Sequence, residues 1–71
     1  MKQVESMRRT RGWSRAELAR RARMDAADVG KIERGRLMPY PAQEAKLARA
    51  LGVSEDDRRS LFEEVDGHGL E

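Results

Sequence analysis

The sequence predicts an all-α domain of five short helices, the second and third of which form a helix-turn-helix. Apolar residues recur at spacings of three and four, and no segment alternates with the period of two that strands show. Two helix-start signals lie close together. Ser14-Arg15-Ala16-Glu17 is a capping box, with Trp13 and Leu18 placed as a hydrophobic staple. Asp25-Ala26-Ala27-Asp28 repeats the arrangement, so one helix must end and another begin near Arg23.

The remaining signals place the other helices. The expected helices span about Lys2–Arg11, Arg15–Ala22, Ala26–Arg34 and Pro41–Leu51, followed by a fifth that is capped by Ser54. Gly12 and Gly52 are expected terminators, Pro41 suits a first helical turn, and the fifth helix starts with acidic residues. Because isolated helices shorter than about 12 residues are marginal in water, packing must hold them.

A chain of 71 residues makes one domain. We expect this domain to span residues 1–66 and residues 67–71 to form a disordered tail. The last two residues, Leu70-Glu71, look like a cloning scar and are not expected to take part in the fold.

Composition argues against several classes of protein. The chain has no Cys and only one His, His68, so neither a metal site nor another cofactor is expected. No apolar run approaches the ~20 residues of a membrane span and no signal peptide is evident, so we expect a cytoplasmic protein. No paired acid and base, nucleophile or phosphate loop indicates an enzyme.

Charge is unevenly distributed along the chain. Residues 1–36 hold eleven Lys and Arg against five Asp and Glu, a net +6, whereas residues 37–71 hold four against eight, a net −4. A positive half that contains the helix pair is what attraction to phosphates requires. The alternative is that an Arg- and Ala-rich chain reflects only a GC-rich genome, with ordinary solvated faces.

An ordered set of motifs resembles the phage Cro/repressor-like (XRE) helix-turn-helix domains. The set comprises Gly12-Trp13-Ser14, Leu18-Ala19, Ile32-Glu33-Arg34-Gly35, Pro39 and Leu47-Ala48-Arg49-Ala50-Leu51-Gly52-Val53. The resemblance covers residues 4–62 without a gap. It implies a compact five-helix, lambda-repressor-like fold whose third helix enters the DNA major groove.

The resemblance also implies roles for individual residues. Arg8 is expected to pair with Glu33 in a structural ion pair, rather than both being solvated charges. The positions that read bases in the family fall on Ala26, Ala27 and Lys31. The alanines offer only methyl contact, which suits the thymine methyl group, and Lys31 is expected to reach either guanine or a phosphate. Residues expected to contact phosphates are Arg15, Arg34, Arg36 and Tyr40.

Three positions depart from the family pattern. Arg23 stands where the family prefers glycine, which leaves open a differently shaped turn. Glu44 occupies a usually apolar position and hints at a rearranged or partner-facing surface. Trp13 replaces a typical leucine, and we interpret it as a core staple.

These observations predict a sequence-specific DNA-binding transcriptional regulator of the repressor type. It would bind double-stranded DNA as a homodimer through a stripe of Leu61, Phe62 and Val65, unless the monomer itself buries that stripe. One alternative is an antitoxin that binds its own promoter and a toxin partner. The other is a protein-interaction module that no longer binds DNA.

Overall fold

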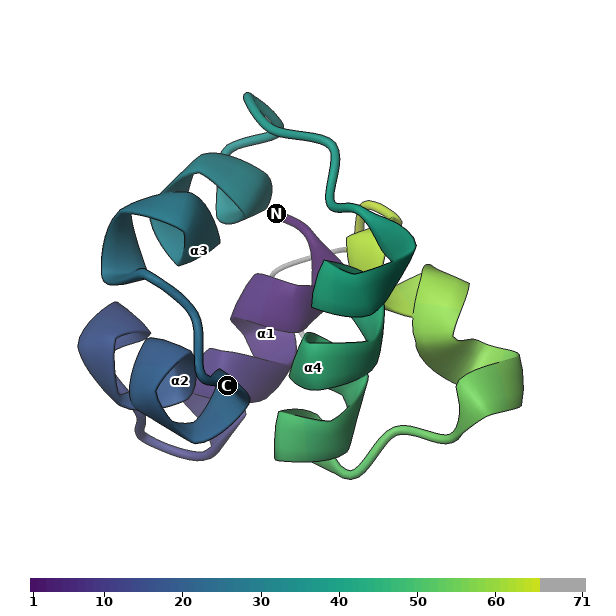
Figure 1. The fold of residues 1–71 in the computed structure, drawn as a ribbon, viewed down its shortest axis with the longest axis horizontal. Helices are drawn as coiled ribbons and strands as arrows, with labels where there is room; N and C mark the ends of the chain where they lie inside the picture. Colours follow the sequence, from purple (N-terminus) through teal and green to yellow (C-terminus); the bar gives the residue numbers. More distant parts are fainter. Residues whose placement is uncertain (66–71) are drawn as a thin grey trace.

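The computed structural model describes residues 1–65, which form four α-helices and one 3₁₀ helix. They are α1 (Gln3–Thr10), α2 (Arg15–Ala22), α3 (Ala26–Glu33), α4 (Pro41–Leu51) and η1 (Glu55–Phe62). In Figure 1, α2 and α3 lie on one side of α4 and η1 lies on the other. The predicted all-α, five-helix architecture is confirmed, although the last helix is 3₁₀ rather than α. The expected tail at 67–71 lies outside the described residues.

The two ends of the described chain are joined by backbone hydrogen bonds. The N–H of Gln3 donates to the carbonyl of Glu63 at 2.9 Å, and the N–H of Val65 donates to the carbonyl of Met1 at 2.8 Å. Lys2 and Glu64 form the bridge between them. The segment after η1 is therefore held against the start of α1.

The two predicted helix starts differ in their caps. The Ser14 hydroxyl accepts a hydrogen bond from the N–H of Glu17 at 3.0 Å, as the capping box predicts. Asp25 occupies the N-cap position of α3 with an extended backbone, but its side chain makes no capping hydrogen bond. The expectation of a carboxylate cap at α3 is therefore wrong, while the position of the helix start is right.

All four α-helices end in the same way. A residue with positive φ comes directly after α2 and α4 and one residue later after α1 and α3, and the residue that follows it donates its N–H to the carbonyl five positions back. These bonds run from Trp13 to Arg8, Met24 to Ala19, Arg36 to Lys31 and Val53 to Ala48. Glycine takes the positive φ at three of these ends, and Arg23 takes it at the end of α2, with φ 57° and ψ 48°. The turn thus keeps its left-handed shape in spite of the arginine.

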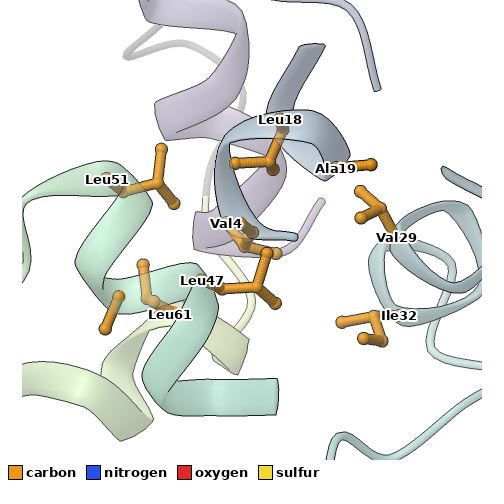
Figure 2. Packing of buried hydrophobic residues seen from close by; sticks show 10 residues of the cluster. Val4, Leu18, Ala19, Val29, Ile32, Leu47, Leu51 and Leu61 are labelled. Atoms are coloured by element: carbon orange, nitrogen blue, oxygen red, sulfur yellow. The ribbon is translucent and has the colours of Figure 1, made fainter. Parts of the chain in front are cut away.

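Side chains from all five helices converge on one core, as Figure 2 shows. Leu18 of α2, Leu47 of α4 and Val4 of α1 are fully buried. Val29 and Ile32 form the inner side of α3. The inward faces predicted from spacing are confirmed, and they hold α3 against α2 with its opposite side turned outward.

The predicted dimer stripe is only partly available at the surface. Leu61 is 0% exposed and belongs to the core, because η1 packs against α1 and α4. Phe62 is half-buried against the same core, and Val65 is half-buried beside Met1. Leu61 is therefore not a contact between copies, which corrects that part of the prediction.

Glu44 has a partner within the same chain. Its Oε1 lies 3.3 Å from Nε of Arg58, and both side chains are largely buried. Arg58 also donates through Nη1 to Glu55 at 2.7 Å. An acidic residue at this position therefore joins α4 to η1, and no rearrangement of α4 is needed to accommodate it.

An ion pair between Arg8 and Glu33 joins the first and third helices. Arg8 Nε donates to Glu33 Oε2 at 2.7 Å and Nη2 donates to Oε1 at 3.1 Å, while Nη1 donates to the carbonyl of Trp13 at 2.8 Å. The Glu33 side chain is 0% exposed and that of Arg8 is 9% exposed. Since a buried carboxylate is costly without a partner, this pair constrains how α3 can lie against α1.

Arg8→Met is expected to lower the free energy of unfolding by about 3 kcal/mol, because it removes the more deeply buried partner of Glu33. Arg15→Met removes a more exposed partner of the same carboxylate and should cost about 1 kcal/mol or less. Urea unfolding followed by circular dichroism measures both. Equal losses, or a smaller loss for Arg8→Met, would contradict this account of the pair.

Arg23→Gly should stabilise the domain by about 0.5 to 1 kcal/mol, because glycine adopts a positive φ without steric cost. For a domain of this size, that corresponds to a rise in Tm of several degrees. Arg23→Ala is the matched control, since it removes the same charge but keeps the strain. Thermal melts in which alanine stabilises as much as glycine would assign the gain to charge instead.

Candidate nucleic-acid interface

The outward side of α3 is open to solvent along its length. Ala26, Ala27 and Lys31 are all exposed, and Ala27 and Lys31 are one turn apart on the same side. Eight residues make a helix about 12 Å long, and the major groove of B-DNA is about 12 Å wide. The three residues predicted to face bases are thus sterically accessible in the monomer.

Arg15, at the start of α2, lies against α3. Its Nε donates to Glu33 Oε1 at 2.8 Å, so the buried carboxylate binds two arginines. This hydrogen bond raises the pKa of Arg15, which therefore stays fully charged. The Arg15 side chain keeps 36% of its surface exposed. The guanidinium is held by Glu33 at Nε, while part of the side chain remains accessible.

The side chains of Arg15 and Arg34 both lie beside Gly30. A Cβ on Gly30 would lie 3.7 Å from both Arg15 Cδ and Arg34 Nη1, so the two side chains cover the same short stretch of α3. The backbone of Gly30 is buried although α3 is a surface helix. Two of the residues expected to contact phosphates are therefore neighbours in the fold.

The connection from α3 to α4 carries the other two residues expected to contact phosphates. In Figure 1 it arches away from the helices. Gly35 has φ +76°, which reverses the chain after α3 and lets the N–H of Arg36 donate to the Lys31 carbonyl at 2.8 Å. Arg36 is exposed, and Tyr40 is 67% exposed. The Tyr40 N–H donates to Gln43 Oε1 at 2.9 Å, which fixes the start of α4.

The structure thus collects the predicted residues around α3, with Arg15 on one side and the α3–α4 connection following its end. Two features were not foreseen from the sequence. The hydrogen bond from Arg15 to Glu33 joins residues 18 positions apart, and no local spacing indicates it. The other is Met38 in the same connection, which is 85% exposed and to which no sequence motif assigns a role.

Residues 1–65 contain neither a cluster of metal ligands nor a membrane-spanning helix. This part of the chain contains no group of three His, Cys, Asp or Glu side chains placed to hold a metal ion. None of its helices has the length and apolar character needed to cross a membrane.

One comparison with known proteins gives a match. A family model described as a helix-turn-helix domain matches residues 2–61, which includes every helix except the last residue of η1. No curated protein and no solved structure matches the chain. The family match agrees with the crossing of α2 and α3 and with the resemblance noted from the sequence, and a helix-turn-helix domain of this kind points in general terms to a DNA-binding regulator. The chain belongs to the helix-turn-helix domain family.

Proposed function

We propose that the protein is a sequence-specific transcriptional regulator that places α3 in the major groove of double-stranded DNA. The observation that carries this proposal is the exposed side of α3, flanked by arginines and held by the buried pair of Arg8 and Glu33. A rigid helix with cations at its borders has the shape and charge that groove binding requires.

Contacts to bases would be few in this arrangement. The methyl groups of Ala26 and Ala27 suit the thymine C5-methyl group, and the Lys31 ammonium suits guanine O6 and N7. Asp25 and Asp28 offer only acceptors, which suit the cytosine amino group and repel phosphates. Sequence preference would therefore rest on shape and apolar contact more than on hydrogen bonds.

Contacts to the backbone would supply most of the affinity. Three guanidinium groups are available for this, those of Arg15, Arg34 and Arg36. Each can donate two parallel hydrogen bonds to the oxygens of one phosphate. Tyr40, exposed at the end of the connection that carries Arg36, adds a hydroxyl donor. Because one domain of this size binds modestly, we further propose that two copies occupy half-sites about one helical turn apart and repress by occupying the site.

The experiment that tests this function is selection of bound duplexes from a random pool, followed by affinity measurements on the enriched sequence. An enriched palindrome with half-sites about 10 base pairs apart supports both specificity and pairing of copies. Binding to mixed duplex DNA at low salt without any enrichment would refute specificity. No binding at micromolar protein would refute the DNA function itself and favour a protein-interaction module.

Arg36→Ala should weaken binding to all duplexes alike and reduce the slope of log K against log salt by about one unit, since one phosphate contact is lost. Arg59→Ala is the matched control, because Arg59 is exposed on η1, away from α3, and carries the same charge. Fluorescence anisotropy at several salt concentrations measures both slopes. An equal effect of the two substitutions would indicate that net charge alone attracts DNA.

A further inference from the structure

A second basic surface lies between the end of α2 and the later part of α4. It is a hollow of about 390 Å³ lined by Arg21, Ala22, Arg23, Lys46 and Arg49. Figure 1 shows α2 and α4 side by side, with the α3–α4 connection at the opposite end of α4. The hollow therefore shares no residue with the surface proposed to bind DNA.

The hollow concentrates positive charge. Lys46 and Arg49 are three residues apart on α4, so their side chains leave the helix on the same side. Within residues 1–65, only Arg21 among the four cations has an acidic partner, donating through Nε to Glu17 at 2.6 Å. The other three cations repel each other across one concave surface, and a bound anion would relieve that repulsion.

The backbone at the hollow is strained as well. Arg23 is the one residue other than glycine with a positive φ in the described part of the chain, and it is one of the residues that line this hollow. The three corresponding positions at the other helix ends are glycines. A strained arginine where glycine would fit better is the kind of outlier that marks a functional position.

We propose that this hollow is a binding site for phosphate chains, independent of the α3 surface. Three of its four cations are arginines, whose guanidinium forks bind phosphate oxygens in pairs, and they approach from two different elements. The ligand is a run of linked phosphates, supplied either by a nucleic-acid backbone or by a free oligophosphate. The site does not depend on the function proposed for α3.

The chain contains its own reporter for this site. Trp13 is its single tryptophan, and the Arg21 guanidinium carbon lies 4.3 Å from the centroid of the indole ring. An anion that draws Arg21 into the hollow changes this cation–π contact and so the tryptophan emission. Tripolyphosphate titrated into the protein at about 20 mM salt, where screening is weak, should give a saturable change with one anion bound per chain. Amide NMR shifts should concentrate at residues 21–23, 46 and 49.

Substitutions distinguish anion binding in the hollow from nonspecific attraction of anions to a basic protein. Arg23→Gly relieves strain, so a thermal melt verifies its fold, and it should still lower tripolyphosphate affinity about tenfold, as expected for loss of one charge-assisted hydrogen bond. Lys46→Gln combined with Arg49→Gln should abolish the saturable change. Arg34→Gln combined with Arg36→Gln removes the same charge at the α3 surface and should leave it intact.

Three results would overturn the proposal: a tryptophan response that does not saturate, equal losses in the two double variants, or oligoglutamate competing as well as tripolyphosphate. A salt-dependence measurement on mixed duplex DNA then identifies the source of the phosphates. If Lys46→Gln with Arg49→Gln reduces the salt slope by at least about one unit, the ligand is a nucleic-acid backbone. If the slope is unchanged while tripolyphosphate binding is lost, the ligand is a free oligophosphate.

Discussion

The buried carboxylate of Glu33 is the constraint on which the arrangement of the first three helices depends. It ends α3, accepts hydrogen bonds from Arg8 on α1 and Arg15 at the start of α2, and has no exposed surface of its own. Eight-residue helices are marginal alone, so their mutual orientation must come from the apolar core and from directional contacts such as this one. An apolar side chain in place of Glu33 could fill the same space, but it would not fix the direction in which the Arg15 side chain points. The carboxylate thus links the stability of the domain to the geometry of its outer surface.

Local sequence signals were sufficient for most of the fold. Capping at Ser14, the left-handed glycines and the apolar spacing placed α2 and α4 at their observed bounds, because each signal acts within a few residues. The fifth helix was expected as an α-helix and is 3₁₀, and the spacing of Leu61 could not show which neighbours would cover it. The candidate site was predicted as a set of residues near α3, but the contact of Arg15 with Glu33 and the hollow between α2 and α4 arise from tertiary packing. Such contacts leave no periodic trace in a single sequence.

The uneven distribution of charge along the chain corresponds to different parts of the fold. Most cations lie on α1, α2, α3 and the connection after α3, whereas η1 begins with three acidic residues. Acidic residues at the start of a helix interact favourably with its dipole, so η1 gains locally from the charges that would repel DNA. Because η1 lies on the other side of α4 from α3 (Figure 1), its acidic residues are kept apart from the α3 surface, which limits that repulsion. The domain thereby combines a modest net charge of +2 with a cationic surface around α3.

The arginine at the end of α2 needs an explanation beyond the helix itself. A cation in the last turn of a helix is favoured by the helix dipole, which would offset part of the strain of a left-handed residue. However, Arg20 and Arg21 already place two positive charges in the last turn of α2, and both are bound to Glu17. A third positive charge gains little further stabilisation from the helix dipole, because this interaction is confined to the last turn and is screened in solution. Stability alone would favour glycine at position 23, as at the ends of α1, α3 and α4. The charge of Arg23 is accounted for if it acts on something outside the chain, and the hollow that it shares with Lys46 and Arg49 is where an anion would meet it.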